Sequence, residues 1–281
     1  MSSLTRYTKR TFVREVLVIA AALLLLLPFY LLVVMAFKDT VEAATSSPVA
    51  PPLVPTLQNF FDVLDMSDRR NVVSGILNSV IITVGSVLCL IGIGSIAAYV
   101  LSRRSGKLSS IAYVFFLLGV ILPFQLGMIP TYIFFRSVHL LGTHVGMILL
   151  YAGLLMPLAV FIYVGFARSI PREYEEAAAI DGATRFQTFR LIVFPLLSPA
   201  TGTVVILTGA VIWNDFMVPL IFLSGSDAGT LPVMIYGFVG ENVSRWNQIF
   251  AVVIVSIVPA LVAFLLAQRK FIQGFAGGIK G

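Results

Sequence analysis

Charged residues are scarce in this sequence. They make up 11% of 281 residues, whereas 58% of the residues are apolar. Soluble domains carry about 25% charged residues because their surfaces face water. The composition therefore excludes an ordinary soluble protein and predicts an integral membrane protein, whose surface faces the lipid bilayer.

Cysteine and histidine are scarce as well, which limits the chemistry that this chain can perform. The single cysteine, Cys89, excludes a disulfide within the chain and a cysteine-based metal site. His139 and His144 are five residues apart, which does not match the i, i+4 pair of a helical zinc site. The P-loop motif G-x-x-x-x-G-K-[ST] is missing too. We therefore expect no enzyme, no metal and no cofactor bound by this chain.

The net charge of +6 raises the question of a nucleic-acid partner. However, the basic residues come in short clusters between apolar runs, without a contiguous patch or interleaved aromatic residues. Such clusters are typical of membrane topology, because lysine and arginine stay on the cytoplasmic side. We expect no nucleic-acid partner.

Six apolar segments are long enough, or nearly so, to cross the bilayer, which takes about 20 helical residues. They are Val16–Phe37, Ile76–Leu101, Ile111–Phe135, Val145–Phe166, Ala200–Leu223 and Ile249–Ala267. The predicted fold class is an all-α polytopic membrane protein of about six helices, one domain over 16–281. Most lysines and arginines lie on one side of these spans, so the N-terminal segment 1–15 and the tail 268–281 are both expected in the cytoplasm.

Proline and small residues predict details of these spans. Glycine, serine and alanine at helical spacing in the second span would let a neighbouring helix approach closely; they are Gly92, Gly94, Ser95, Ala97 and Ala98. Prolines are expected to kink or break four helices or helix ends; they are Pro28, Pro123, Pro130 and Pro157. After the first span, Leu57–Leu64 is expected to be a short amphipathic segment at the membrane interface.

One carboxylate, Asp215, lies well within a predicted span, beside Trp213 and Asn214. A charge at the bilayer centre costs roughly 2.5–3.5 kcal/mol, so it usually has a function. A proton- or sodium-driven carrier normally needs several such groups, so the driving energy is expected to come from elsewhere. An aromatic ring beside an amide and a carboxylate suits a polyhydroxylated solute, but hydrogen bonding between helices explains the three residues equally well. The absence of lysine and arginine from the spans disfavours an anionic solute.

The longest polar interruption, residues 168–198, predicts two short helices around a turn. Pro171 and three glutamates mark the start of the first helix, and Gly182 marks its end. Thr184 and Gln187 have the spacing of a capping box at the start of the second. Its apolar residues are expected on one stripe, made of Phe186, Phe189, Val193 and Leu196.

The first of these helices has an unusual face. Tyr174, Ala177 and Ala178 lie at i, i+3 and i+4, with Glu173 and Glu176 beside them. A helix resting on lipid would carry basic residues instead. The acidic, small-residue face therefore predicts docking onto a protein partner.

These residues resemble the signature of a known family. Glu176-Ala177-Ala178, Gly182, Ile192 and Pro195 match the spacing of the EAA motif in permease subunits of ABC importers. The chain most resembles the carbohydrate-uptake branch, which contains the smaller permease of the maltose transporter. Asn78-Ser79, Ala98-Tyr99, Trp213 to Phe216, Thr230 to Pro232 and the C-terminal Gly277–Gly281 agree with that branch, while Phe194 departs from its usual leucine.

The resemblance implies a type I importer fold and half of a transmembrane pathway for an oligosaccharide or related neutral solute. The implied partners are a second permease in a pseudo-twofold heterodimer, a cytoplasmic ATPase dimer using ATP and magnesium, an extracytoplasmic solute-binding protein, and the lipid of the bacterial inner membrane. An importer of glycerol phosphate or a polyol, and a secondary carrier without an ATPase, are the alternatives.

The resemblance also implies roles for particular residues. The residues expected to couple the chain to the ATPase are Glu173, Glu176, Ala177, Ala178, Asp181 and Gly182. The tail residues expected to sense the ATPase are Gly277, Gly278 and Lys280, and the solute path is expected at Trp213, Asn214 and Asp215.

Overall fold

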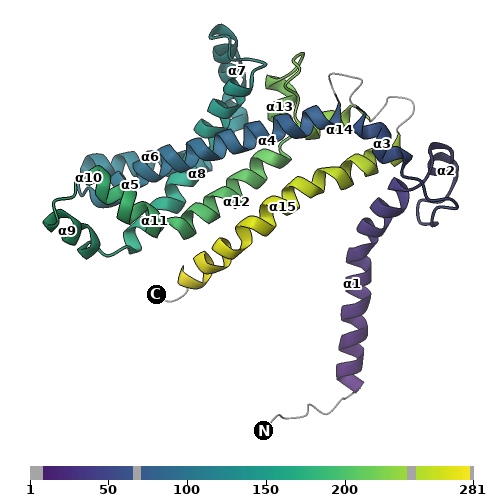
Figure 1. The fold of residues 1–281 in the computed structure, drawn as a ribbon, viewed down its shortest axis with the longest axis horizontal. Coiled ribbons are helices and arrows are strands. Elements are labelled where there is room, and N and C mark those ends of the chain that lie inside the picture. The colour runs from purple at the N-terminus through teal and green to yellow at the C-terminus, as the bar shows by residue number, and fades with distance from the viewer. Residues whose placement is uncertain (1–8, 66–70, 239–244, 279–281) are drawn as a thin grey trace. The chain divides into compact units, whose positions relative to one another are not determined.

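The computed structural model describes residues 9–65, 71–238 and 245–278, and every regular element in these ranges is a helix (Figure 1). Three helices, Arg10–Ala36, Val72–Arg103 and His144–Ser169, are long and apolar enough to cross a membrane. Two bent helix pairs raise the number of candidate spans to five, and a shorter apolar helix covers Trp246–Pro259. The predicted all-α membrane fold is confirmed.

The chain divides into two compact units. The first holds α1 (Lys9–Ala36), α2 (Thr40–Thr45), α3 (Gln58–Leu64) and the first part of α15 (Trp246–Gly278). The second holds the helices between residues 71 and 236 and the later part of α15. Each unit is described by itself.

In the first unit, a network of hydrogen bonds surrounds the C-terminal end of α1. Lys38 is fully buried, and its ammonium donates to Ser46 Oγ at 2.7 Å and to the Ser47 carbonyl at 2.8 Å. Asn59 of α3 donates to the carbonyls of Ala36 and Lys38, and Asn247 of α15 donates to Asn59 Oδ1 at 2.7 Å. These bonds satisfy carbonyls that the end of α1 leaves without a helical partner. The helix predicted near Leu57–Leu64 is confirmed as α3.

The second unit is built around α8 (His144–Ser169). This helix contacts α4 (Val72–Cys89), α5 (Ser95–Arg103), α6 (Lys107–Ile121) and α12 (Ser198–Asn214), which lie side by side in Figure 1. A π-helical turn, η1 (Leu90–Gly94), joins α4 to α5. Small residues let η1 and α5 approach α8 closely, because Ser95 and Ala98 are buried and a Cβ on Gly94 would meet Ala159 of α8 at 3.4 Å. A Cβ on Gly92 would meet nothing, so only part of the predicted small-residue set serves packing.

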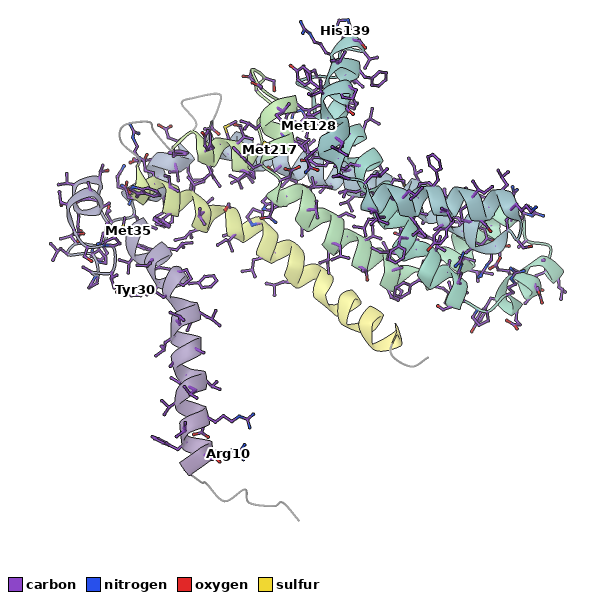
Figure 2. The ribbon with its side chains drawn as sticks, turned by 180° about the vertical axis from the view of Figure 1, so that it is seen from behind. Arg10, Tyr30, Met35, Met128, His139 and Met217 are labelled. Carbon is purple, nitrogen blue, oxygen red and sulfur yellow. The ribbon has the colours of Figure 1, made fainter. Side chains whose placement is uncertain are left out.

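The third predicted span is a bent pair of helices and not one continuous helix, and the break expected at Pro123 is confirmed. After α6, the chain turns by 95° into a 3-10 turn, η2 (Phe124–Gly127), and α7 (Met128–Ser137). Pro123 disfavours helical backbone at the preceding residue, and Leu122 is extended, with ψ of 125°. Figure 2 shows His139 at the tip of α7. The other prolines break no helix, because Pro28 and Pro157 lie inside α1 and α8, and Pro130 lies in the first turn of α7.

The fifth predicted span, Ala200–Leu223, is also wrong as one continuous helix. The helix α12 ends at Asn214, Asp215 is extended, and the chain resumes as α13 (Met217–Phe222). On its other side α12 continues, with a 69° bend, from the helical stretch Arg185–Leu196. Asp215 therefore lies at a helix break.

A buried hydrogen-bond network ties α4 to α8 and to the segment before α14 (Leu231–Tyr236). The Asn78 amide donates to the carbonyls of Asp227 and Gly229, both at 3.0 Å. Its Oδ1 is therefore the acceptor that faces His144 Nε2 at 2.7 Å, so that this nitrogen carries a proton. Next to it, Ser79 Oγ accepts the Leu231 N–H at 2.9 Å.

Replacing Asn78 by leucine is expected to lower the thermal unfolding midpoint in detergent. Each buried donor or acceptor left without a partner costs about 1–3 kcal/mol. His144→Gln should keep most of the stability, because a glutamine amide can donate to Asn78 as Nε2 does, whereas His144→Ala should not. Unfolding is measured by intrinsic fluorescence. Equal unfolding midpoints for the wild type and the Asn78→Leu variant would show that the network contributes nothing to stability.

Candidate docking and transport site

The first predicted helix of the polar interruption is α9 (Glu173–Ile180), with three glutamates in its first turn. Its end is set by Gly182, whose φ of +80° a residue with a side chain rarely adopts. The Gly182 N–H donates to the Ala179 carbonyl, and the Ala183 N–H donates to the Ala178 carbonyl. This pair of bonds is the Schellman motif, which satisfies the last carbonyls of the helix. The predicted helix and stop are confirmed.

One of the three glutamates ties α9 to the end of α5. Glu175 accepts a hydrogen bond from the Tyr99 hydroxyl at 2.8 Å and forms an ion pair with Arg103 Nε. The Arg103 and Glu175 side chains are only 14% and 17% exposed, and Arg103 also donates to the Ile170 carbonyl. We call this arrangement of Tyr99, Arg103 and Glu175 the tether. It was not predicted, although Tyr99 and Arg103 have the i, i+4 spacing of one helix face.

The exposed face of α9 carries the other two acids, Glu173 and Glu176. Tyr174 is 53% exposed and Ile180 is 87% exposed, so apolar groups are presented beside the carboxylates. Ala177, Asp181 and Gly182 are exposed as well. Ala178, predicted on the same face, is instead buried within the chain and packs α9 against it. The face of α9 that is available to a partner is therefore acidic and partly apolar.

The second predicted helix begins as α10 (Arg185–Thr188), with the capping box of Thr184 and Gln187 in place. It continues as a π-helical turn, η3 (Phe189–Val193), and α11 (Phe194–Leu196). A π-helical turn inserts an extra residue and rotates the residues after it about the helix axis.

The predicted apolar stripe is right for Phe189 and Val193 and wrong for Phe186 and Leu196. The buried residues are Phe189, Val193 and Leu197, whereas Phe186 is 64% exposed and Leu196 is 43% exposed. The stripe expected from regular helical spacing is therefore displaced by one residue after the π-helical turn.

The predicted solute-path residues surround the break between α12 and α13. Asp215 accepts hydrogen bonds from the Tyr151 hydroxyl of α8 at 2.9 Å and from the Met217 N–H at 3.0 Å. The carboxylate thus links two helices and satisfies a donor at the start of α13. Asn214 is exposed and donates to the Ala210 carbonyl at 2.8 Å, and Trp213 is half-buried. Hydrogen bonding between helices explains why Asp215 lies at the break, and the solute role stays a prediction for all three residues.

The predicted tail is mostly a continuation of the last helix. The helix α15 runs past the expected end at Ala267 and includes Gly277 and Gly278 in its final turn. Lys280 lies outside the described residues.

Residues 90–275 match the family described as binding-protein-dependent transport system inner membrane component. The melibiose/raffinose/stachyose import permease of Bacillus subtilis is 35% identical over 98% of both chains. The multiple sugar-binding transport system permease of Streptococcus mutans is 34% identical, over 95% of this chain and 96% of the relative.

The fold was also compared with solved structures. It matches a chain of a bacterial ABC transporter that imports the acidic polysaccharide alginate, with a TM-score of 0.82 at 21% identity. The match covers 95% of this chain and 99% of that one. At this identity the likeness concerns the fold alone.

Proposed function

The chain belongs to the family of binding-protein-dependent transport system inner membrane components, and from this we propose that it is one of two permease subunits of an ATP-driven sugar importer in the bacterial inner membrane. The observation that carries the proposal is α9, a short helix fastened to a membrane span by the tether while its acidic face stays exposed. A helix mounted in this way can transmit movement between a cytoplasmic partner and the span.

The partner proposed for α9 is a cytoplasmic ATPase dimer. Glu173 and Glu176 would pair with basic residues in a cleft of the ATPase, and Tyr174 and Ile180 would supply the apolar contact at the centre of the interface. The Schellman turn at Gly182, with Asp181 beside it, lets the chain leave that cleft. Gly277, Gly278 and Lys280 are proposed to reach the ATPase as a sensing tail.

The proposed mechanism is a population shift between two states. ATP and magnesium are used by the ATPase subunit, whose closure moves α9 and, through the tether, the end of α5. The cavity formed with the second permease then opens outward, where a binding protein delivers the solute. This chain transmits and gates, and it performs no bond chemistry.

The proposed solute is a neutral oligosaccharide, because the relatives from Bacillus subtilis and Streptococcus mutans are permeases for sugars. These relatives do not favour an importer of glycerol phosphate or a polyol, or a secondary carrier. Within the chain, Trp213 and the exposed Asn214 are the proposed solute contacts, and Asp215 holds the helix break that presents them.

Reconstitution tests this function. Vesicles that contain both permeases and the ATPase, supplied with the binding protein, should accumulate labelled raffinose only with internal ATP. In these vesicles Asn214→Ala should reduce uptake about tenfold, the effect of one lost hydrogen bond of about 1.4 kcal/mol, with an unchanged unfolding midpoint. Uptake by this chain alone would exclude the proposal, and transport of glycerol 3-phosphate but not of sugars would exclude the sugar assignment.

A further inference from the structure

A strongly basic cleft of about 320 Å³ lies beside the turn between α5 and α6, where α8 ends. Its lining combines three arginines with several serines and no carboxylate. The lining residues are Leu101, Ser102, Arg104, Ser105, Gly106, Ser109, Ser110, Arg168 and Arg172. We call this the basic cleft. It belongs entirely to the second unit.

The arginines of the basic cleft are poorly neutralised by the chain itself. Among the described residues, neither Arg104 nor Arg168 forms an ion pair with a carboxylate; Arg168 lies over the Tyr113 ring, 4.9 Å from its centroid. Arg172 donates only to a backbone carbonyl, that of Arg103. Glu175 is already occupied by the tether. Guanidinium groups gathered in this way repel one another, and an anion bound between them would remove that cost.

Two glutamates come near this site without lining it. Glu173 and Glu176 line an adjoining cleft of about 650 Å³, which shares Ser102, Arg168 and Arg172 with the basic cleft. The acidic side of α9 thus begins where the basic cleft ends. The arginine-rich end is left for an anion, and the acidic end for the proposed basic partner.

The chemistry of the basic cleft fits a phosphate group. Guanidinium groups bind phosphate oxygens in a bidentate manner. The Ser105 and Ser110 hydroxyls could donate to the same oxygens, whereas the Ser102 and Ser109 hydroxyls donate to the carbonyls of Tyr99 and Leu101. The first turn of α6 also presents backbone N–H groups nearby that no N-cap side chain satisfies, because the N-cap residue is Gly106. A phosphate in the cleft would therefore meet charge and donors from three segments.

The surroundings indicate where the phosphate comes from. Leu108, Ile111 and Phe115 follow the cleft on α6 at i, i+3 and i+7, and they are 82%, 61% and 76% exposed. This apolar face runs from the cleft into the membrane-spanning part of α6, so an acyl chain could lie on it while the headgroup phosphate sits among the arginines. We propose that the basic cleft binds the phosphate group of an acidic phospholipid in the cytoplasmic leaflet.

A lipid bound in the basic cleft would also affect coupling. A lipid phosphate would join the α5–α6 turn to the α8–α9 connection, immediately beside Arg103 of the tether. Lipid composition would then affect how firmly α9 is held. The lipid site depends on the proposed orientation of the chain in the membrane and not on the identity of the solute. A result that excludes the lipid site would therefore leave the proposed transport function intact.

The test uses the assembled complex in detergent and a short-chain phosphatidylglycerol. Retained lipid is counted by native mass spectrometry, and the dissociation constant is measured by fluorescence titration. Arg104→Gln with Arg168→Gln should weaken binding about tenfold or more, as expected for the loss of charge-assisted hydrogen bonds worth at least about 1.4 kcal/mol. The control Arg10→Gln with Arg14→Gln removes two arginines that do not line the basic cleft and should bind like the wild type.

A second titration separates the possible sources of the phosphate. Glycerophosphoglycerol, the same headgroup without acyl chains, should bind much more weakly than the lipid. If it binds equally well, the lipid assignment is wrong and the cleft is a site for a soluble phosphate compound. Equal loss of lipid in both double variants, or loss of the ATPase with unchanged lipid binding in the Arg104/Arg168 variant, would overturn the phosphate site itself.

Discussion

Replacing Glu176 by lysine together with Gly182 by valine is expected to reduce ATP-driven uptake about 100-fold, to the background of empty vesicles. The reason is that an uncompensated charge in an interface costs about 2–5 kcal/mol. Glu176 lies on the exposed face of α9, where the substitution would put a positive charge against the basic residues proposed on the ATPase. Gly182 has φ of +80°, and a β-branched residue there strains the turn by about 1–3 kcal/mol. Loss of docking should appear as loss of the ATPase on co-purification.

The controls for this double variant separate docking from folding. Glu176→Gln keeps the shape of the side chain and should lower uptake only partly, because a neutral amide does not repel the basic partner. Gly153→Ala changes another glycine at a position where a Cβ meets no atom within 4 Å, and it should behave like the wild type. Normal membrane insertion is expected for all three proteins. Uptake that persists in the Glu176/Gly182 double variant would remove α9 from the docking role.

Local signals predicted the polar interruption well. The capping box at Thr184 and Gln187, and the glycine stop at Gly182, depend on residues five or fewer positions apart, so their hydrogen bonds can be predicted from the local sequence. The same holds for the type of the long apolar helices, which length and hydropathy determine, although only three of the six predicted spans are single long helices. The boundaries of the two helices in the polar interruption were predicted to within a few residues.

Breaks within the spans were harder to predict, because composition alone does not show them. Pro123 and Pro157 both lie in apolar segments, yet only Pro123 ends a helix. Pro157 stays inside α8, where neighbouring helices pack around it. The break at Asp215 depends on the Tyr151 hydroxyl of another helix, 64 residues away in sequence. The two π-helical turns have no motif of their own, and one of them displaced the predicted apolar stripe.

The tether was missed for a related reason. Glu175 is one of three similar acids in a first helical turn, and nothing local distinguishes it from Glu173 or Glu176. Glu175 differs from them because it pairs with Arg103, which is 72 residues away in sequence. The packing of α5 against α8 places Arg103 there. A buried ion pair of this kind is weak evidence for stability but good evidence for a fixed geometry. We therefore expect its effect mainly in coupling.

Replacing Glu175 by alanine is expected to uncouple transport from ATP hydrolysis. Breaking the pair removes hydrogen bonds to charged groups worth about 1.5–3 kcal/mol each, and it leaves Arg103 nearly buried without its partner. The α9 face that docks is unchanged, so the ATPase should remain bound and keep hydrolysing ATP. Uptake should nevertheless fall about tenfold or more, since loss of about 1.4 kcal/mol or more lets α9 move without α5.

The charge swap decides whether this effect comes from the ion pair. Arg103→Glu combined with Glu175→Arg should restore part of the coupling that each single variant loses, because the two side chains can pair again with reversed polarity. Tyr99→Phe removes only one neutral donor to Glu175 and should cost less than either charged variant. If the swap is no better than the worse single variant, or if Glu175→Ala releases the ATPase, the tether does not transmit movement. In that case α9 must reach the spans through Ala178 and the buried residues behind it, which a bulky substitution at Ala178 would disturb in the same assay.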